Sequence, residues 1–472
     1  MREAMGEAIE VEGATTRGRL AELWTMPFAF LGFALWRAWV SLSYAAPALP
    51  VPVGAPMEGK LVYDVCLAAA SVALAFGARR LVPLAGRRWP YLVCFALMTG
   101  SSTMQVAAVN GWLDPGLLVV RDVCAGAGSA VMILLWCEVY ACLSATRVAV
   151  YLSFSWILGV LVTFVLEGLR VPYLEGALVA LPGLSLLLVW RSYSLYIDPA
   201  DRPRAAQSRY VPLRIFGLVA LYGLIEGLCA LRVGDGYAWL VGSHSTWATL
   251  VGGVLLFVCA YCLSGRLDFT RLYRTPAVLM VCGLLFVPLF GFGGSVFGAF
   301  CVSVSSTLFG CVVFLLLCDL SKRKGVAALW LFGLEEALVL VDHAGAGVES
   351  LVFGAPGLAP YGDALVSVAG ILLVVVFTAV SLGGRGRAAA PAMLSEQERL
   401  LTACDAVARE RALTPRELEV LRLLVQGKSL SAVARELIIA EGTAKAHTQH
   451  IYEKVGVSRR QELLEAVRGR AG

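Results

Sequence analysis

The sequence predicts an all-α protein with about twelve transmembrane helices, arranged as six plus six, followed by a small four-helix domain. Hydrophobic residues make up 58% of the 472 residues and charged residues only 15%, whereas a soluble chain carries about 25% charged residues. Apolar stretches of bilayer length recur as far as Leu382. The last sixty or so residues are polar instead and carry helix-cap signals and apolar residues at helical spacing.

These patterns divide the chain into four segments. Residues 1–20 form a polar N-terminal tail, 21–383 a polytopic membrane domain, 384–411 a linker with an amphipathic helix, and 412–472 the four-helix domain.

A helix needs about 20 mostly apolar residues to cross a bilayer. Because backbone groups in lipid must hydrogen-bond internally, each such stretch is expected to be helical. The ninth stretch is short and contains Pro288. The expected spans are Trp24–Tyr44, Leu61–Ala78, Tyr91–Val109, Val123–Leu143, Val148–Glu167, Leu174–Trp190, Leu213–Leu231, Thr246–Leu263, Ala277–Gly291, Val296–Asp319, Val326–Gly345 and Ala364–Leu382.

Basic residues in the loops predict the orientation. The loops after the second, fourth, sixth, eighth and tenth spans hold sixteen Lys and Arg, and the alternate loops hold four. Cytoplasmic loops carry the excess of basic residues. Both termini, and with them the last domain, are therefore expected in the cytoplasm.

The layout resembles the major facilitator superfamily of transporters. The resemblance rests on the span count and on the longest internal loop, Arg191–Arg214, between the two halves. The loop after the second span has Gly77-Ala-Arg-Arg and Gly86-Arg-Arg but no acidic residue. The resemblance is thus one of architecture.

Ionisable residues within spans are costly and often functional. The resemblance implies that spans one, four and seven line a central cavity, so Arg37, Glu138 and Glu226 could share a site for a small polar or charged ligand. Glu335, with Glu336, lies in the eleventh span and is a further candidate. Structural ion pairs between helices are the alternative. For Asp342 and His343 we favour solvation at a helix end.

No enzymatic site is expected. Twelve of the thirteen cysteines lie in apolar runs, where free thiols behave as small hydrophobes. Cys259 and Cys262 have CxxC spacing but lie midway along an apolar helix. With four histidines and no phosphate-binding glycine loop, the sequence predicts no catalytic residues, no metal and no cofactor.

The linker combines a flexible exit from the membrane with an amphipathic helix. Gly383-Gly-Arg-Gly-Arg387 and Pro391 suit the exit. Ser395 and Glu398 form a possible capping box, and apolar residues follow at spacings of three and four up to about Arg411. This helix could cover the next helix as a lid or pair with a second copy, and we favour the lid.

The last segment predicts four helices. Thr414 is placed to cap a helix with Pro415 at its first position and Glu417 three residues after the cap. Gly427 ends that helix, and residues 429–437 form a second, short one. A turn at 438–440 leads into a helix over 441–455, and residues 459–468 form the last. In the third helix the expected inward residues are Ala444, His447, Ile451 and Val455.

Two short helices and a tight turn before a longer helix fit the helix-turn-helix description. This segment resembles the LuxR-type domain shared by quorum regulators and NarL-like response regulators. Ala440, Ala444 and Val455 depart from the family pattern, and Ala440 removes a capping hydroxyl unless Glu441 replaces it. The resemblance is carried by Leu413-Thr-Pro-Arg-Glu417, Val420-Leu421, Gly427, Val433-Ala434, Leu437, Thr443, Lys445, His447, Ile451-Tyr452, Lys454, Val457, Arg460 and Glu462-Leu463.

The resemblance implies a DNA-binding site on the third helix. Lys445, Ala446 and Gln449 match positions that read base edges in the major groove. Thr443 and Lys454 are expected at phosphates, and Thr448 lies on the same predicted face. From Thr414 onward ten basic residues face seven acidic ones, a balance that suits a phosphate backbone. The resemblance also implies a dimer formed through the last helix, Arg459–Val467, and hence an inverted-repeat operator.

We therefore expect a membrane-bound one-component transcription regulator in the bacterial inner membrane. The membrane bundle would sense a signal, with an unknown small molecule as a possible ligand, and the last domain would bind double-stranded promoter DNA as a homodimer. The alternative is a transporter with a regulatory DNA-binding tail, which flux in reconstituted vesicles would distinguish. A third possibility is that the bundle is a passive anchor in the lipid bilayer.

Overall fold

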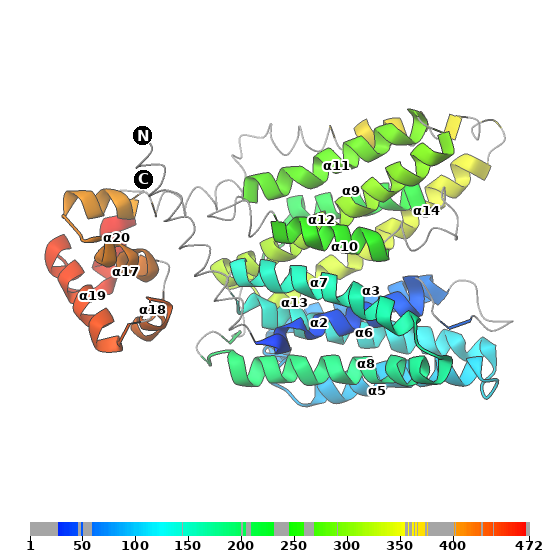
Figure 1. The fold of residues 1–472 in the computed structure, drawn as a ribbon, viewed down its shortest axis with the longest axis horizontal. Helices are drawn as coiled ribbons and strands as arrows, with labels where there is room; N and C mark the ends of the chain where they lie inside the picture. Colours follow the sequence, from blue (N-terminus) through cyan, green and yellow to red (C-terminus); the bar gives the residue numbers. More distant parts are fainter. Residues whose placement is uncertain are drawn as a thin grey trace. The chain divides into compact units, whose positions relative to one another are not determined.

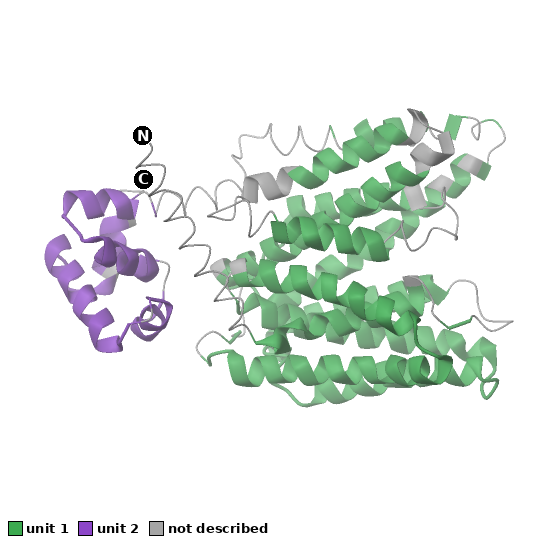
Figure 2. Ribbon diagram, in the orientation of Figure 1, with its two compact units in different colours: residues 1–377 green, residues 378–472 purple. Residues whose placement is uncertain are grey.

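The computed structural model describes residues 27–45, 49–50, 59–143, 145–199, 202–203, 209–230, 245–258, 269–289, 291–354, 357, 361–362, 364–365, 367–372, 375, 401, 403–425, 428–437 and 439–468. The chain forms two compact units, Met1–Phe377 and Thr378–Gly472, which Figure 2 shows in different colours. Within the described ranges both units are built from helices and contain no strand. The prediction of an all-α chain is confirmed.

The first six expected spans correspond to helices of the first unit (Figure 1). The first span is α2 with short helical segments on either side, and its beginning lies outside the described residues. The elements are η1 (Phe28–Gly32), α2 (Phe33–Val40), η2 (Ser41–Ala45), α3 (Gly59–Phe76), α4 (Ala78–Leu81), α5 (Trp89–Val109), η3 (Pro115–Leu117), α6 (Leu118–Ala141), α7 (Ala145–Glu167), α8 (Val171–Arg191) and η4 (Ser192–Tyr196).

The next spans follow as α9 (Leu213–Ala230), α10 (Thr246–Phe257), α11 (Phe269–Leu289), α12 (Gly291–Lys324), α13 (Ala328–Glu335), η7 (Glu336–Leu338) and α14 (Val339–Gly354). The ninth span is longer than expected, because α11 begins at Phe269. The eleventh continues past Gly345 to the end of α14, so Asp342 and His343 lie in the first turns of α14 and not at the far end of the span. The expected span Ala364–Leu382 lies largely outside the described residues.

Six helices in the described part of the chain are long and apolar enough to cross a membrane. They cover Gly59–Phe76, Trp89–Val109, Pro115–Ala141, Arg147–Glu167, Val171–Tyr196 and Val296–Lys322. Shorter apolar helices cover Thr246–Phe257 and Thr275–Phe286. Many large apolar side chains on these helices are exposed, such as Phe164 and Leu92 at 71% and 70%. Such a surface needs lipid rather than water as its solvent.

Tryptophan and serine side chains join neighbouring helices inside this unit. Burying an indole N–H without a partner is costly. In three pairs, a serine hydroxyl on a neighbouring helix accepts the hydrogen bond from the indole N–H. The pairs are Trp36–Ser129, Trp39–Ser102 and Trp136–Ser185, at 3.3, 2.8 and 3.1 Å. All six side chains lie in the first half of the bundle, so these bonds fix α2 against α5 and α6, and α6 against α8.

Glycine allows a close helix contact in the second half. A Cβ atom at Gly345 of α14 would overlap the carbonyl oxygen of Leu224, and one at Gly227 of α9 would overlap that of Asp342. Small residues let membrane helices approach this closely. Across this contact the carboxyl groups of Glu226 and Asp342 interact electrostatically.

The second unit contains α17 (Pro415–Val425), α18 (Leu430–Leu437), α19 (Glu441–Val455) and α20 (Arg460–Arg468). Their apolar faces enclose one core. Residues 403–410 are also helical, and Ala403, Cys404 and Val407 belong to the same core. The linker helix is thus the lid that the sequence favoured. The predicted capping box at Ser395 and Glu398 lies outside the described residues.

Candidate nucleic-acid interface and intramembrane polar residues

The start of α17 has the predicted capping box. The Thr414 backbone N–H donates to Glu417 Oε2 at 2.7 Å, and the Glu417 backbone N–H donates to Thr414 Oγ1 at 3.3 Å. Together the two side chains satisfy N–H groups that a helix start leaves without partners. Glu417 is only 3% exposed, so its carboxylate also requires a cation.

Lys454 of α19 supplies that cation. Its Nζ donates to Glu417 Oε2 at 2.7 Å and to the Ala412 carbonyl at 3.3 Å. Burial raises the pKa of Glu417, but the hydrogen bonds from Lys454 and Thr414 outweigh it and leave the pKa below its ordinary value. This contact fixes the end of α19 to the start of α17. Lys454, which was expected at a phosphate, therefore has a structural partner inside the domain.

Four other basic side chains also stabilise the unit. Each one pairs with a carboxylate or caps the carbonyl end of a helix. Arg416 bonds Glu419 and the Leu437 carbonyl, Arg422 bonds Asp405, Lys428 bonds Glu436, and Arg460 bonds the carbonyls of Leu424 and Lys428. Lys445 differs from them, since it is exposed and makes no hydrogen bond or ion pair with the described residues.

The outer surface of α19 presents four of the predicted contact residues. Thr443, Lys445, Ala446 and Gln449 are all exposed. Gln449 Nε2 donates to Glu453 Oε1 at 3.3 Å, a bond within the helix that an adenine could replace. Ala440 precedes the helix without a side-chain cap.

Thr448 is a correction to the predicted surface. Its side chain is buried, and its hydroxyl donates to the Ala444 carbonyl at 2.8 Å. The inward residues of α19 are Ala444, Thr448, Ile451 and Val455. His447, which was expected to face inward, is only half-buried. Thr448 is thus part of the core and not of the outer face.

This arrangement defines the class of the second unit as a helix-turn-helix DNA-binding domain, with α18 and α19 as its two helices. Residues 411–467 match the family "Bacterial regulatory proteins, luxR family". The C-terminal segment is therefore a luxR-family domain, as its motifs indicated.

Curated relatives match a segment of similar length. The "Probable transcriptional regulatory protein NarL" of two Mycobacterium tuberculosis strains, CDC 1551 / Oshkosh and H37Rv, is 48% identical over 59 residues, which are 12% of this chain and 27% of the relative. The chain thus spans about a quarter of the length of these relatives.

Two solved transporter structures are similar to a larger part of the chain at 12% identity. The major facilitator superfamily transporter FucP, in the outward conformation, has a TM-score of 0.48, with 75% of this chain and 98% of that chain covered. The proton:xylose symporter XylE has a TM-score of 0.45, with 74% and 93% covered.

In the membrane unit, Glu138 of α6 holds a loop. Its carboxylate accepts the backbone N–H groups of Leu84 and Ala85 at 3.0 and 2.6 Å. The residue is 1% exposed. These bonds satisfy a carboxylate in an apolar setting and fix the basic loop that follows α4, so Glu138 already has partners of its own.

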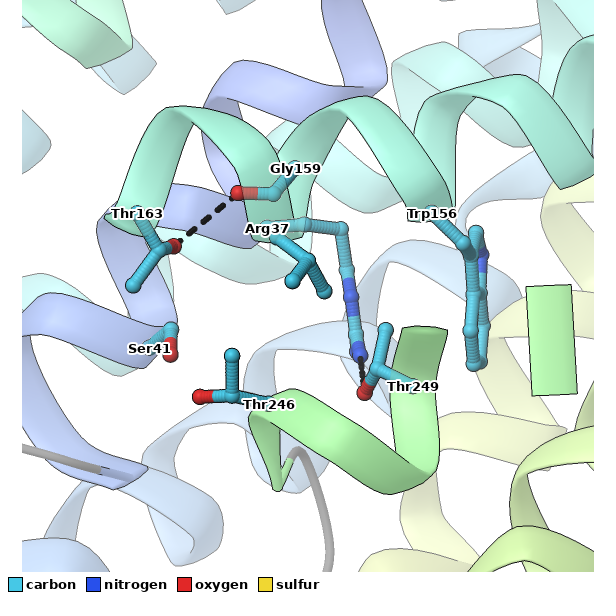
Figure 3. Close-up of a pocket in the computed structure, with 8 residues that line it drawn as sticks. Arg37, Ser41, Trp156, Gly159, Thr163, Thr246 and Thr249 are labelled. Atoms are coloured by element: carbon cyan, nitrogen blue, oxygen red, sulfur yellow. Dashed lines mark hydrogen bonds between the residues drawn. The ribbon is translucent and has the colours of Figure 1, made fainter. Parts of the chain in front are cut away.

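Arg37 of α2 lies in different surroundings. Its Nη2 donates to Thr249 Oγ1 of α10 at 3.2 Å, and its guanidinium lies 4.4 Å from the ring centroid of Trp156 on α7. Figure 3 shows the side chain running from α2 to Thr249 along one side of a small cavity. The structure places Arg37 at the meeting point of three helices.

The remaining candidates lie around α3, α9 and α13–α14. Glu226 interacts electrostatically with Asp342, as described above. Glu335 ends α13 beside Glu336, which interacts electrostatically with Arg37 and Asp64. That Arg37, Glu138, Glu226 and Glu335 form a ligand site remains a prediction.

The sequence interpretation missed Asp64. This residue is 1% exposed, and its Oδ2 lies 2.7 Å from His343 Nε2. Lys60, one turn earlier in α3, pairs with the same oxygen. The available signal was an aspartate one turn into an apolar stretch, which is rare unless it has a partner. The contact joins α3 to α14.

Proposed function

We propose that this protein is a membrane-bound one-component transcription regulator. The membrane unit receives a signal, and the luxR-family domain binds promoter DNA. The observation that carries the proposal is the surface of α19, where Lys445, Ala446 and Gln449 are exposed and Lys445 makes no hydrogen bond or ion pair with the described residues. Base-reading side chains must be exposed and available in this way.

The basic loops support a cytoplasmic position for the DNA-binding domain. Lys322, at the end of α12, donates to the carbonyls of Cys142 and Leu143 at the end of α6. Lys324 lies 3.9 Å from the ring centroid of Tyr210 in the central loop. Three loops that their charges assign to the cytoplasm therefore lie on one side of the bundle. We infer that both termini lie on this cytoplasmic side. We also infer that the protein resides in the inner membrane of a bacterium.

We further propose that the active form is a homodimer on an inverted repeat. Leu463 and Val467 of α20 are in the core, whereas Leu464 is half-buried. Leu464 is thus available to a second copy of α20. A two-fold dimer binds two half-sites related by the same symmetry.

DNA binding is tested with the full-length protein in lipid nanodiscs, using duplexes selected from a random pool. We expect enrichment of an inverted repeat and an affinity that falls steeply with salt. Lys445→Ala should lower the affinity for the selected sequence, whereas Arg409→Ala, which removes the same charge from the lid helix, should leave it nearly unchanged. Equal effects of the two variants would mean that α19 does not read the DNA.

Sensing is distinguished from passive anchoring by removing the residues before Met393 and comparing the promoters that the two forms regulate. If the bundle senses a signal, the truncated protein loses its response to growth conditions. An unchanged response would reduce the bundle to an anchor.

A further inference from the structure

A small polar cavity lies where α2, η2, α7 and α10 meet. Figure 3 shows the side chains around it. The residues that line it are Arg37, Ser41, Trp156, Gly159, Val160, Thr163, Thr246 and Thr249. One cation and four hydroxyl groups therefore face a common space inside an otherwise apolar bundle.

The chemistry of the lining favours a negative charge. A guanidinium group only donates hydrogen bonds, and each hydroxyl has one O–H to donate. Thr163 uses its O–H on the Gly159 carbonyl of its own helix at 3.0 Å. Thr249 accepts from Arg37 at 3.2 Å, which leaves its own O–H directed elsewhere. None of the described residues that line the cavity is acidic.

The surrounding helices hold the guanidinium in place. A Cβ atom at Gly159 would lie 3.2 Å from both the Ala34 carbonyl and Arg37 Cβ, so glycine allows α7 to approach α2 here. This approach brings the Trp156 ring over the guanidinium at 4.4 Å. The ring and Thr249 together fix the direction of the side chain, and the cation needs no large rearrangement to meet an anion.

The size of the cavity restricts the ligand. The centre of a water-sized particle has about 10 Å³ in which to move, which is the room that one water molecule needs. A sugar, a nucleotide or a phosphate group is too large for this space. A single-atom anion is the charged species whose size comes close to it.

We propose that this cavity binds a small monovalent inorganic anion, with chloride as the probe that fits its size and charge. Glu336 interacts electrostatically with Arg37 but does not line the cavity, so it offsets part of the attraction and the affinity should be modest. Binding itself is independent of the DNA-binding proposal. If the anion is also the input signal of the regulator, that role rests on the DNA-binding proposal.

The position of the cavity gives a route from binding to a change of the bundle. Arg37 and Trp156 belong to the first six spans, whereas Thr246 and Thr249 belong to the second six. An anion held by Arg37 and by the hydroxyl groups of Thr246 and Thr249 stabilises the arrangement in which α10 is close to α2 and α7. A ligand shifts a conformational equilibrium through such a difference in affinity.

The test measures the thermal unfolding midpoint of the purified full-length protein in detergent. Chloride replaces gluconate at constant ionic strength, and gluconate is too large to enter. The proposal expects a rise in the midpoint that saturates with chloride. Arg37→Gln should remove the saturable rise, and Thr249→Val should raise the half-saturating concentration about tenfold. Thr99→Val is the matched control, because this exposed hydroxyl of α5 bonds only the Phe95 carbonyl of its own helix.

Identical curves in chloride and gluconate would overturn the proposal, since they would leave the cavity to water. So would a saturable rise that persists unchanged in Arg37→Gln. If Arg37→Gln does not fold, the width of the chlorine NMR signal decides between the outcomes. Broadening by the wild-type protein that is reduced in Thr249→Val and retained in Thr99→Val supports the site. Equal broadening by all three proteins contradicts it. DNA binding by the same samples is measured separately, so that a failure of either proposal is recognised.

Discussion

Lys454 Nζ and Glu417 Oε2 lie 2.7 Å apart and join α19 to the first turn of α17. One carboxylate therefore both caps a helix and positions the helix that is proposed to enter the major groove. Glu417→Ala removes the capping interaction, worth about 1 kcal/mol, and leaves Lys454 without its anion. We expect a loss of about 2–3 kcal/mol of local stability.

Amide hydrogen exchange in the full-length protein measures that loss, as faster exchange in α17 and α19. Glu419→Ala is the control, because Glu419 pairs with Arg416 on the exposed side of the same helix. Faster exchange by the same factor in both variants would show that the contact with α19 has no special role.

The same carboxylate predicts how the domain responds to acid. The folded pKa of Glu417 lies below its ordinary value of 4.5. A depressed folded pKa contributes stability above the unfolded pKa, and this stability is lost as the pH falls through the folded value. The wild-type domain should therefore lose protection from exchange below about pH 4.5. Glu417→Gln should reduce this pH dependence, and an unchanged dependence would assign it to other groups.

Substitution of Lys445 should lower DNA affinity much more than substitution of Thr448. Thr448→Val removes a buried hydroxyl that bonds the Ala444 carbonyl of its own helix, away from the outer face, and should change DNA affinity less than about twofold. Lys445→Ala should cost about 1–3 kcal/mol on the selected sequence. Fluorescence anisotropy of labelled duplexes measures both. A larger effect at Thr448 than at Lys445 would reverse the assignment of the outer face.

The contact between α9 and α14 depends on glycine at one position and not at the next. Gly345→Ala places a Cβ against the Leu224 carbonyl, whereas Gly347→Ala meets nothing within 4 Å. Overpacking of this kind costs about 1–3 kcal/mol. We expect Gly345→Ala to lower the thermal unfolding midpoint of the detergent-solubilised protein and Gly347→Ala to leave it unchanged. Equal midpoints would contradict the close approach.

Local sequence signals predicted the elements but not the contacts between them. Thr414, Pro415 and Glu417 predicted the start of α17 because capping depends on neighbours in the chain. Helical spacing could not separate His447 from Thr448, since both lie close to the inward face. The structure buries Thr448, whose hydroxyl can bond the Ala444 carbonyl, so a polar residue occupies that position at little cost.

Pairs distant in the sequence could not be predicted from spacing. Lys454 looked like a phosphate ligand because its partner Glu417 lies 37 residues earlier. The pairing of Asp64 with His343 spans 279 residues. For Glu138, the sequence indicated a costly buried charge, but only the fold brings the backbone N–H groups of Leu84 and Ala85 to it.

The central claim is that the intact membrane protein binds specific promoters through α19. Genome-wide mapping of the DNA bound by the full-length protein in its own cells tests it most directly, with a Lys445→Ala, Gln449→Ala variant expressed to the same level in the membrane. We predict discrete promoter sites that share an inverted repeat and disappear in the variant. Sites that persist unchanged in the variant, or the absence of any enriched site for the wild-type protein, would contradict the claim.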